Sequence, residues 1–259
     1  MKPRKIKIER WTVAQSHEKD YWCPRKHGGA HASTSRVYWS EYWSLLRSYT
    51  DVNEKSRILE IGCGPDGMIN YIDECDKIAL DSLMDFYVRR YDVPKKMAWI
   101  KGIGESVPFR SDCFDVIIST NTLNHMWDPV RAIADISRVL KKRAFLLLTV
   151  DCYSPLVRRY KIIRELIGVG DRSHPHSFSM KYVFEIMVNS GLHVVNVRKR
   201  PKSACARYAA LLRHMKDGDI MRLINAMIIT ILSLIWQKLT AVNGDGRFIF
   251  IASKHHVIN

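Results

Sequence analysis

A glycine-rich loop is the part of the sequence whose residue types and spacing best suit ligand binding. Gly62, Gly64 and Gly67 follow an apolar run, residues 57–62, that predicts a buried strand. Glycines allow a tight turn and let a ligand approach the main chain, and the start of the helix expected from about residue 67 to 75 offers free N–H groups. The spacing matches the dinucleotide-binding fingerprint and predicts a loop that holds a nucleotide-like ligand.

A carboxylate ends the next predicted strand, residues 76–81. Asp81 lies 21 residues after Glu60, where an acidic side chain can accept hydrogen bonds from both hydroxyls of a ribose. This holds for the ribose of NAD and for that of S-adenosylmethionine, so Asp81 does not distinguish the two cofactors. The alternative role of Asp81 is to cap the following helix.

The segment after the third predicted strand carries a recognisable pattern. Residues 57–151 resemble the class I S-adenosylmethionine-dependent methyltransferases, of the small-molecule type similar to ubiquinone and menaquinone biosynthesis methyltransferases. The matching positions are Glu60, Gly62, Gly64, Gly102, Glu105, Pro108, Phe109, Phe114 and Asp115, together with the run 119–125 and Asp128-Pro129.

The resemblance implies S-adenosylmethionine as the cofactor and assigns its contacts. Glu60 and the backbone at Gly62 and Gly64 would hold the methionine end, and Asp81 the ribose. Asn121 would lie beside the sulfonium.

The sequence departs from the family at the adenine site. Ile103 occupies the family's acidic adenine-binding position, so Glu105 or a backbone group near Gly104 would take that role, or apolar contact would hold the adenine.

Two histidines are candidate proton acceptors, because a neutral imidazole can remove a proton near pH 7. His176 precedes a predicted helix in a region that faces the substrate in similar methyltransferases, and His125 follows the fourth predicted strand. We rank His176 first, since His125 is better suited to form a wall of the pocket near Trp127. Cys23, His27 and His31 have spacing compatible with metal binding, but too few ligands are present, and no metal is expected.

The expected elements alternate between strand and helix. This alternation predicts an α/β Rossmann-like, doubly wound, mostly parallel seven-stranded sheet, with an N-terminal helical cap and a helical insertion before the last strand. We expect a basic and aromatic cap over residues 1–50, irregular up to residue 35 and helical over 36–49. The methyltransferase domain would cover 51–259, with the insertion at about 204–240.

Composition restricts the partners and the compartment. The net charge is +15, and residues 158–216 contribute 13 lysines and arginines against three acids. This favours an anionic acceptor or an anionic lipid surface, with weak, nonspecific binding to nucleic acid. Six dispersed cysteines without a C-x-x-C pair, and no apolar run after the basic N-terminus, predict a cytoplasmic protein, with a peripheral position on the inner face of a membrane left open.

The most apolar stretch lies between Arg222 and Lys238. Its 15 uncharged residues fall short of the about 20 that a spanning helix needs, so the sequence predicts no transmembrane helix. Contact of residues 219–238 with a membrane surface stays open beside packing on the protein's own sheet or on a second copy. The oligomeric state is not predicted.

The predicted function is methyl transfer to a small-molecule or lipid-linked acceptor. An RNA methyltransferase is the first alternative, suggested by the charge, although no appended RNA-binding module is visible. The alternative from another class is a noncatalytic binding module that keeps the cofactor fold.

Overall fold

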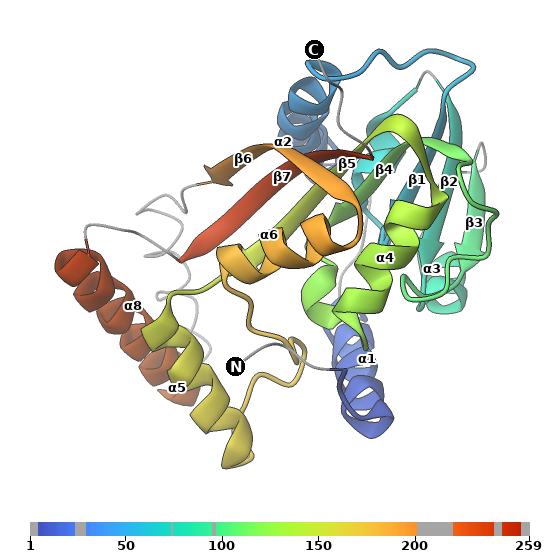
Figure 1. Cartoon of the computed structure of the whole chain (residues 1–259). Coiled ribbons are helices and arrows are strands. Elements are labelled where there is room, and N and C mark those ends of the chain that lie inside the picture. The colour runs from blue at the N-terminus through green and yellow to red at the C-terminus, as the bar shows by residue number, and fades with distance from the viewer. Residues whose placement is uncertain are drawn as a thin grey trace.

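Seven strands form one mixed sheet in a computed structural model that describes residues 5–23, 30–73, 75–94, 97–200, 220–240 and 245–254 (Figure 1). The strand order is β3-β2-β1-β4-β5-β7-β6, and β7 is antiparallel to both of its neighbours. The strands are β1 (Arg57–Ile61), β2 (Asp76–Asp81), β3 (Ala98–Lys101), β4 (Phe114–Thr120), β5 (Leu140–Cys152), β6 (Leu192–Arg200) and β7 (Gly246–Lys254). The predicted fold class is confirmed.

Helices cover both faces of the sheet. The helices are α1 (Ile8–Trp22), α2 (Ala30–Arg47), α3 (Met84–Arg90), α4 (Pro129–Val139), α5 (Pro155–Leu166), α6 (Met180–Asn189) and α8 (Ile220–Thr240), with short 3-10 turns η1 (Met68–Tyr71) and η2 (Leu123–His125). In Figure 1, α4 and α6 lie on one face and α2 on the other. Alternate residues of β1 separate the two cores, since Leu59 packs with α4 and α6 and Ile58 packs with α2.

Capping residues fix two of these helices where the sequence predicts them. The Asp128 side chain accepts a hydrogen bond from the Arg131 N–H, and Pro129 occupies the first helical position of α4. The Ser179 hydroxyl accepts the N–H of Tyr182 at the start of α6. These caps set the ends of the loops that lead from the sheet edge into the helices.

Three expectations about local structure are wrong. Residues 8–22, expected to be irregular, form α1. The helix expected over residues 67–75 is reduced to η1, and α5 occupies a region without a predicted element. Of the insertion expected at about 204–240, residues 204–219 lie outside the described residues, and α8 forms the remainder. The division into a cap and a methyltransferase domain stays a prediction.

Candidate active site

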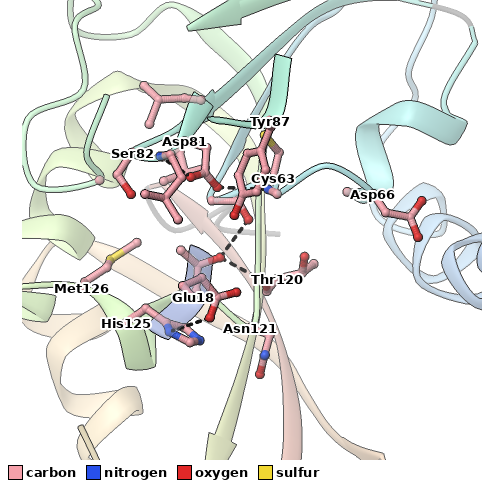
Figure 2. Close-up of a pocket in the computed structure, with 18 of the residues that line it drawn as sticks. Glu18, Cys63, Asp66, Asp81, Ser82, Tyr87, Thr120, Asn121, His125 and Met126 are labelled. Atoms are coloured by element: carbon pink, nitrogen blue, oxygen red, sulfur yellow. Dashed lines mark hydrogen bonds and ion pairs between the residues drawn. The ribbon is translucent and has the colours of Figure 1, made fainter. Parts of the chain in front are cut away.

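A cavity of about 430 Å³ opens at the carboxyl ends of β1, β2 and β4 (Figure 2). This is the edge where open α/β sheets bind ligands. The α1 helix covers one side, because successive residues on one helical face line the cavity. These are Trp11, Gln15, Glu18 and Trp22.

The glycine loop forms the wall after β1. Gly62 has a φ of +71°, and a Cβ there would lie 2.0 Å from the Thr122 side chain, so only glycine fits. Gly64 also has a positive φ, of +54°, and its nearest neighbour would be Trp22 at 3.9 Å. The space beside Gly64 is therefore free for a ligand that approaches the backbone.

Glu60 lies beneath this loop and does not line the cavity. Its carboxylate is fully buried and accepts hydrogen bonds from the backbone of Met68 and Ile69 and from the Thr120 hydroxyl. Burial raises the pKa of Glu60 to about 7. The Glu60 carboxylate thus holds η1 against β1, and its predicted contact with the methionine end of a cofactor stays a prediction.

Asp81 reaches the cavity from the tip of β2. Its Oδ2 accepts the Gly64 N–H at 3.0 Å, and its Oδ1 accepts the Leu83 N–H at 2.8 Å. Each carboxylate oxygen keeps a further lone pair for a ligand hydroxyl. Burial raises the pKa of Asp81 to about 6, so the acid titrates just below neutral pH.

The candidate adenine side contains Gly104 and Glu105. A Cβ at Gly104 would lie 2.7 Å from Met126, so the chain passes close to that side chain. The Glu105 carboxylate accepts the backbone N–H groups of Trp127 and Asp128. Burial raises the pKa of Glu105. Glu105 thus braces the loop after η2, while Ile103 and Gly104 also line the cavity.

Asn121 follows β4 in the left-handed conformation, with a φ of +57°. Its Oδ1 accepts a hydrogen bond from Arg247 Nη2 at 2.8 Å, and the Arg247 guanidinium also pairs with Asp151. Because β5 and β7 place Asp151 opposite Arg247, the sheet register itself orients the Asn121 amide. The sequence analysis missed Arg247, since its role depends on this antiparallel pairing.

His125 lines the cavity on η2. Its Nδ1 has no hydrogen-bond partner among the described residues and lies 3.8 Å from Glu18 Oε2, which is beside it in the cavity (Figure 2). The rings of His125 and His174 are 4.4 Å apart, and His174 Nδ1 lies 3.1 Å from Asp171 Oδ2. Burial, together with His174, lowers the pKa of His125 to about 3, so His125 is neutral at pH 7.

His176 is placed differently from the expectation. It is buried outside the cavity lining, and its Nε2 donates a hydrogen bond to the Met126 carbonyl at 2.8 Å. Burial lowers the pKa of His176 to about 4. Of the two candidate proton acceptors, His125 therefore faces the cavity, whereas His176 anchors the loop that carries Met126.

No group of three or more metal-ligating side chains is present within the described part of the chain. Of the three residues considered as metal ligands, Cys23 directly follows α1 and has an exposed thiol. His27 and the side chain of His31 lie outside the described residues.

The cavity fits an adenosine-containing cofactor. The glycine wall at Gly64 leaves room at the backbone, and Asp81 retains acceptor capacity for ribose hydroxyls at the adjoining strand tip. Asn121 and His125 follow the end of β4 and line the same cavity.

Comparison with known proteins agrees with this geometry. Residues 59–148 match the model of the methyltransferase domain family. Over this segment the chain is similar to a methyltransferase domain. It is 22% identical over 163 residues to a sterol 24-C-methyltransferase of Candida albicans, covering 58% of this chain and 43% of that protein. It is 29% identical over 124 residues to the uncharacterized methyltransferase YcgJ of Bacillus subtilis, covering 43% of this chain and 46% of YcgJ.

A solved structure shows the same fold. The geranyl diphosphate C-methyltransferase of Streptomyces coelicolor, in complex with S-adenosyl-L-homocysteine, superposes with a TM-score of 0.58 at 12% identity, over 83% of this chain and 79% of that one. The predicted family resemblance is confirmed, and the expected methyltransferase class and cofactor agree with these findings. The matches span less than half the length of the two curated relatives.

Proposed function

We propose that this protein transfers a methyl group from S-adenosylmethionine to a small-molecule acceptor of lipid or lipid-linked type. The observation that carries the proposal is one cavity lined by the Gly62–Gly64 loop and Asp81 on one side and by Asn121 and His125 on the other. The similarity to methyltransferases whose names specify a sterol and geranyl diphosphate supports an acceptor built on an isoprenoid or similar lipid.

The chain's own residues divide the work of binding and reaction. Asp81 would accept the ribose hydroxyls, and the backbone at Gly62 and Gly64 would hold the amino-acid end. The bound cofactor supplies an electrophilic methyl group. Arg247 holds the Asn121 amide in place, and Asn121 would restrict where the acceptor atom can approach the methyl group. Holding the acceptor atom and the methyl group close together and in line would supply a large part of the rate.

The acceptor would lose its proton to a residue on the side of the cavity formed by α1 and η2. If the acceptor is a hydroxyl, the neutral Nδ1 of His125 accepts its proton, and the nearby Glu18 carboxylate stabilises the imidazolium that forms.

We place the protein in a reducing compartment, the cytoplasm, as part of the same proposal. Five cysteines are free thiols in the described residues, namely Cys23, Cys63, Cys75, Cys113 and Cys152. Dispersed free thiols are typical of cytoplasmic proteins. An anionic acceptor is favoured by the net charge of +15.

Methyl transfer to fractionated extracts tests the proposal. The protein is incubated with methyl-labelled cofactor and with separate lipid, small-molecule and RNA fractions, beside an Asp81→Asn variant as the control. We expect label in the lipid or small-molecule fraction. Label in RNA alone would favour the RNA methyltransferase, and cofactor binding without transfer to any fraction would favour a noncatalytic module.

A further inference from the structure

Apolar side chains are exposed along two neighbouring helices outside the candidate active site. We define the α5–α8 surface as Ile163, Leu166, Ile167 and Val169 at the end of α5, with Ile220, Met221, Ile224, Met227, Ile231, Leu234, Ile235 and Leu239 on α8. Leu166 is 81% exposed and Leu239 is 74% exposed. The α8 positions recur every three or four residues, so they form one stripe along the helix.

The core of the protein does not cover this stripe. The α8 helix packs beside α5, and Figure 1 shows the pair projecting away from the sheet. None of the 18 residues of Leu223–Thr240 is buried. This excludes packing of α8 on the protein's own sheet, and a contiguous exposed apolar surface of this kind marks an interaction site.

The same stretch is long and apolar enough to cross a membrane, with a mean hydropathy of 1.5. The sequence-based exclusion of a spanning helix counted only the residues between two charges and is wrong on length and composition. Topology nevertheless opposes a crossing. Arg200 at the end of β6 lies opposite Arg247 at the start of β7 in the antiparallel ladder. The insertion therefore leaves the sheet and returns to it at the same end of these two strands.

A single crossing by α8 would require a second crossing to return to that end of the strands. The remaining segment, residues 201–219, carries six charged side chains in its 19 residues. A membrane-spanning helix needs about 20 predominantly apolar residues, so this segment does not supply the return. The topology therefore favours α8 lying along the surface of a bilayer.

Charge indicates the kind of bilayer. Exposed basic residues lie on the same two helices, Arg159 on α5 and Lys238 on α8. Residues 158–216 as a whole carry a net charge of +10. Apolar side chains beside basic ones are the combination with which interfacial helices bind anionic lipids.

We propose that the α5–α8 surface docks the protein on an anionic lipid bilayer, with α8 in the plane of the interface. The α5 helix begins three residues after β5 ends, at the same carboxyl edge of the sheet that holds the cavity. Docking would thus bring the cavity's edge to the membrane. The delivery of a membrane-resident acceptor rests on the proposed function, whereas the docking itself does not.

Flotation of the full chain with vesicles tests the docking. We compare vesicles of phosphatidylcholine alone with vesicles that also contain phosphatidylserine, at low and high salt. The test variant is Ile231→Glu with Leu234→Glu, and the matched control is Val37→Glu, which changes a residue 66% exposed on α2. Both substitutions alter exposed side chains, and thermal unfolding of every variant reports that the fold is intact.

We expect the protein to float with the anionic vesicles and to bind neutral vesicles at least tenfold more weakly. High salt should weaken the binding to anionic vesicles. The α8 variant should lose this binding, and the Val37→Glu control should keep it. Equal binding by the α8 variant, or no binding to anionic vesicles at low salt, would overturn the proposal. Resistance to alkaline carbonate would show a spanning helix instead. A lipid-free dimer that the α8 variant dissociates would assign the surface to a second copy. Flotation without adenosylhomocysteine binding would refute the proposed function and leave the docking standing.

Discussion

Glu18 of α1 and His125 of η2 lie beside each other in the cavity, with 3.8 Å between Oε2 and Nδ1. The two residues are 107 positions apart in the sequence, and the cover helix α1 brings them together. A carboxylate beside a buried, neutral imidazole stabilises the protonated ring. We therefore propose His125 as the base to be tested first, with His176 as the alternative.

His125→Ala should lower kcat by roughly 10²–10⁴-fold if the acceptor gives up a proton, because that is the usual loss when a general base is removed. Glu18→Gln should cause a smaller loss in kcat. Adenosylhomocysteine affinity, measured separately, should stay unchanged in both variants. Nearly full turnover by His125→Ala would mean that the acceptor arrives already nucleophilic.

His176→Ala should act on stability, since the ring is buried and its Nε2 donates to the Met126 carbonyl. Loss of this bond leaves a buried carbonyl without its donor, which costs about 1–3 kcal/mol. Thermal unfolding should therefore shift to lower temperature, and turnover of the folded fraction should remain. Loss of kcat without loss of stability would restore His176 as the proton acceptor.

Asp81→Asn should weaken cofactor binding. Hydrogen bonds to a charged acceptor contribute about 1.5–3 kcal/mol, so adenosylhomocysteine should bind roughly 10- to 150-fold less tightly. The matched control is Asp85→Asn on the adjoining α3, whose carboxylate pairs with Lys101 on the surface. Calorimetry should show no change for the control, and equal affinities for the two variants would contradict the ribose contact.

The free energy of unfolding of the cofactor-free protein should depend on pH through the titration of Asp81. Burial raises its pKa from 3.8 to about 6, so the folded state favours the protonated acid. The stabilisation from the bound proton is complete below pH 4 and lost as the pH rises through 6, on the order of 3 kcal/mol. The stability of Asp81→Asn relative to the wild type should therefore increase between pH 4 and pH 7. A constant difference in denaturant titrations would show that Asp81 is not buried in this way.

The sequence predicts the sheet and the glycine loop well because both depend on local patterns. Apolar runs, glycine positions and the Asp128-Pro129 cap are all read within a few residues. The α1 helix was missed because its cavity face mixes aromatic and polar residues, Trp11, Gln15, Glu18 and Trp22, and shows no apolar periodicity. Their spacing of four, three and four residues is a signal that could have found it.

Other features of the site depend on contacts that no local pattern contains. Glu60 matches the family's acidic position, but only the packing of η1 shows that its carboxylate accepts hydrogen bonds from the backbone. Arg247 fixes Asn121 through the register of β5 and β7. His125 follows a strand and His176 precedes a helix, and neither position shows in the sequence that only His125 lines the cavity.

Binding to nucleic acid should be weak and strongly dependent on salt. If the basic segment 158–216 contacts RNA, each phosphate contact releases counterions, and affinity falls steeply as salt rises. We expect nonspecific binding at low salt that disappears at physiological salt, measured by fluorescence anisotropy with RNAs of unrelated sequence. A sequence-specific complex that survives physiological salt would favour the RNA methyltransferase.

The most direct test of the central claim is the choice of cofactor by the purified protein. Titration calorimetry with S-adenosylhomocysteine and, separately, with NAD compares two ligands that both carry a ribose suited to Asp81. Binding of S-adenosylhomocysteine with one site per chain, and no heat with NAD, is the predicted result. Tight binding of NAD with no binding of S-adenosylhomocysteine would contradict the account.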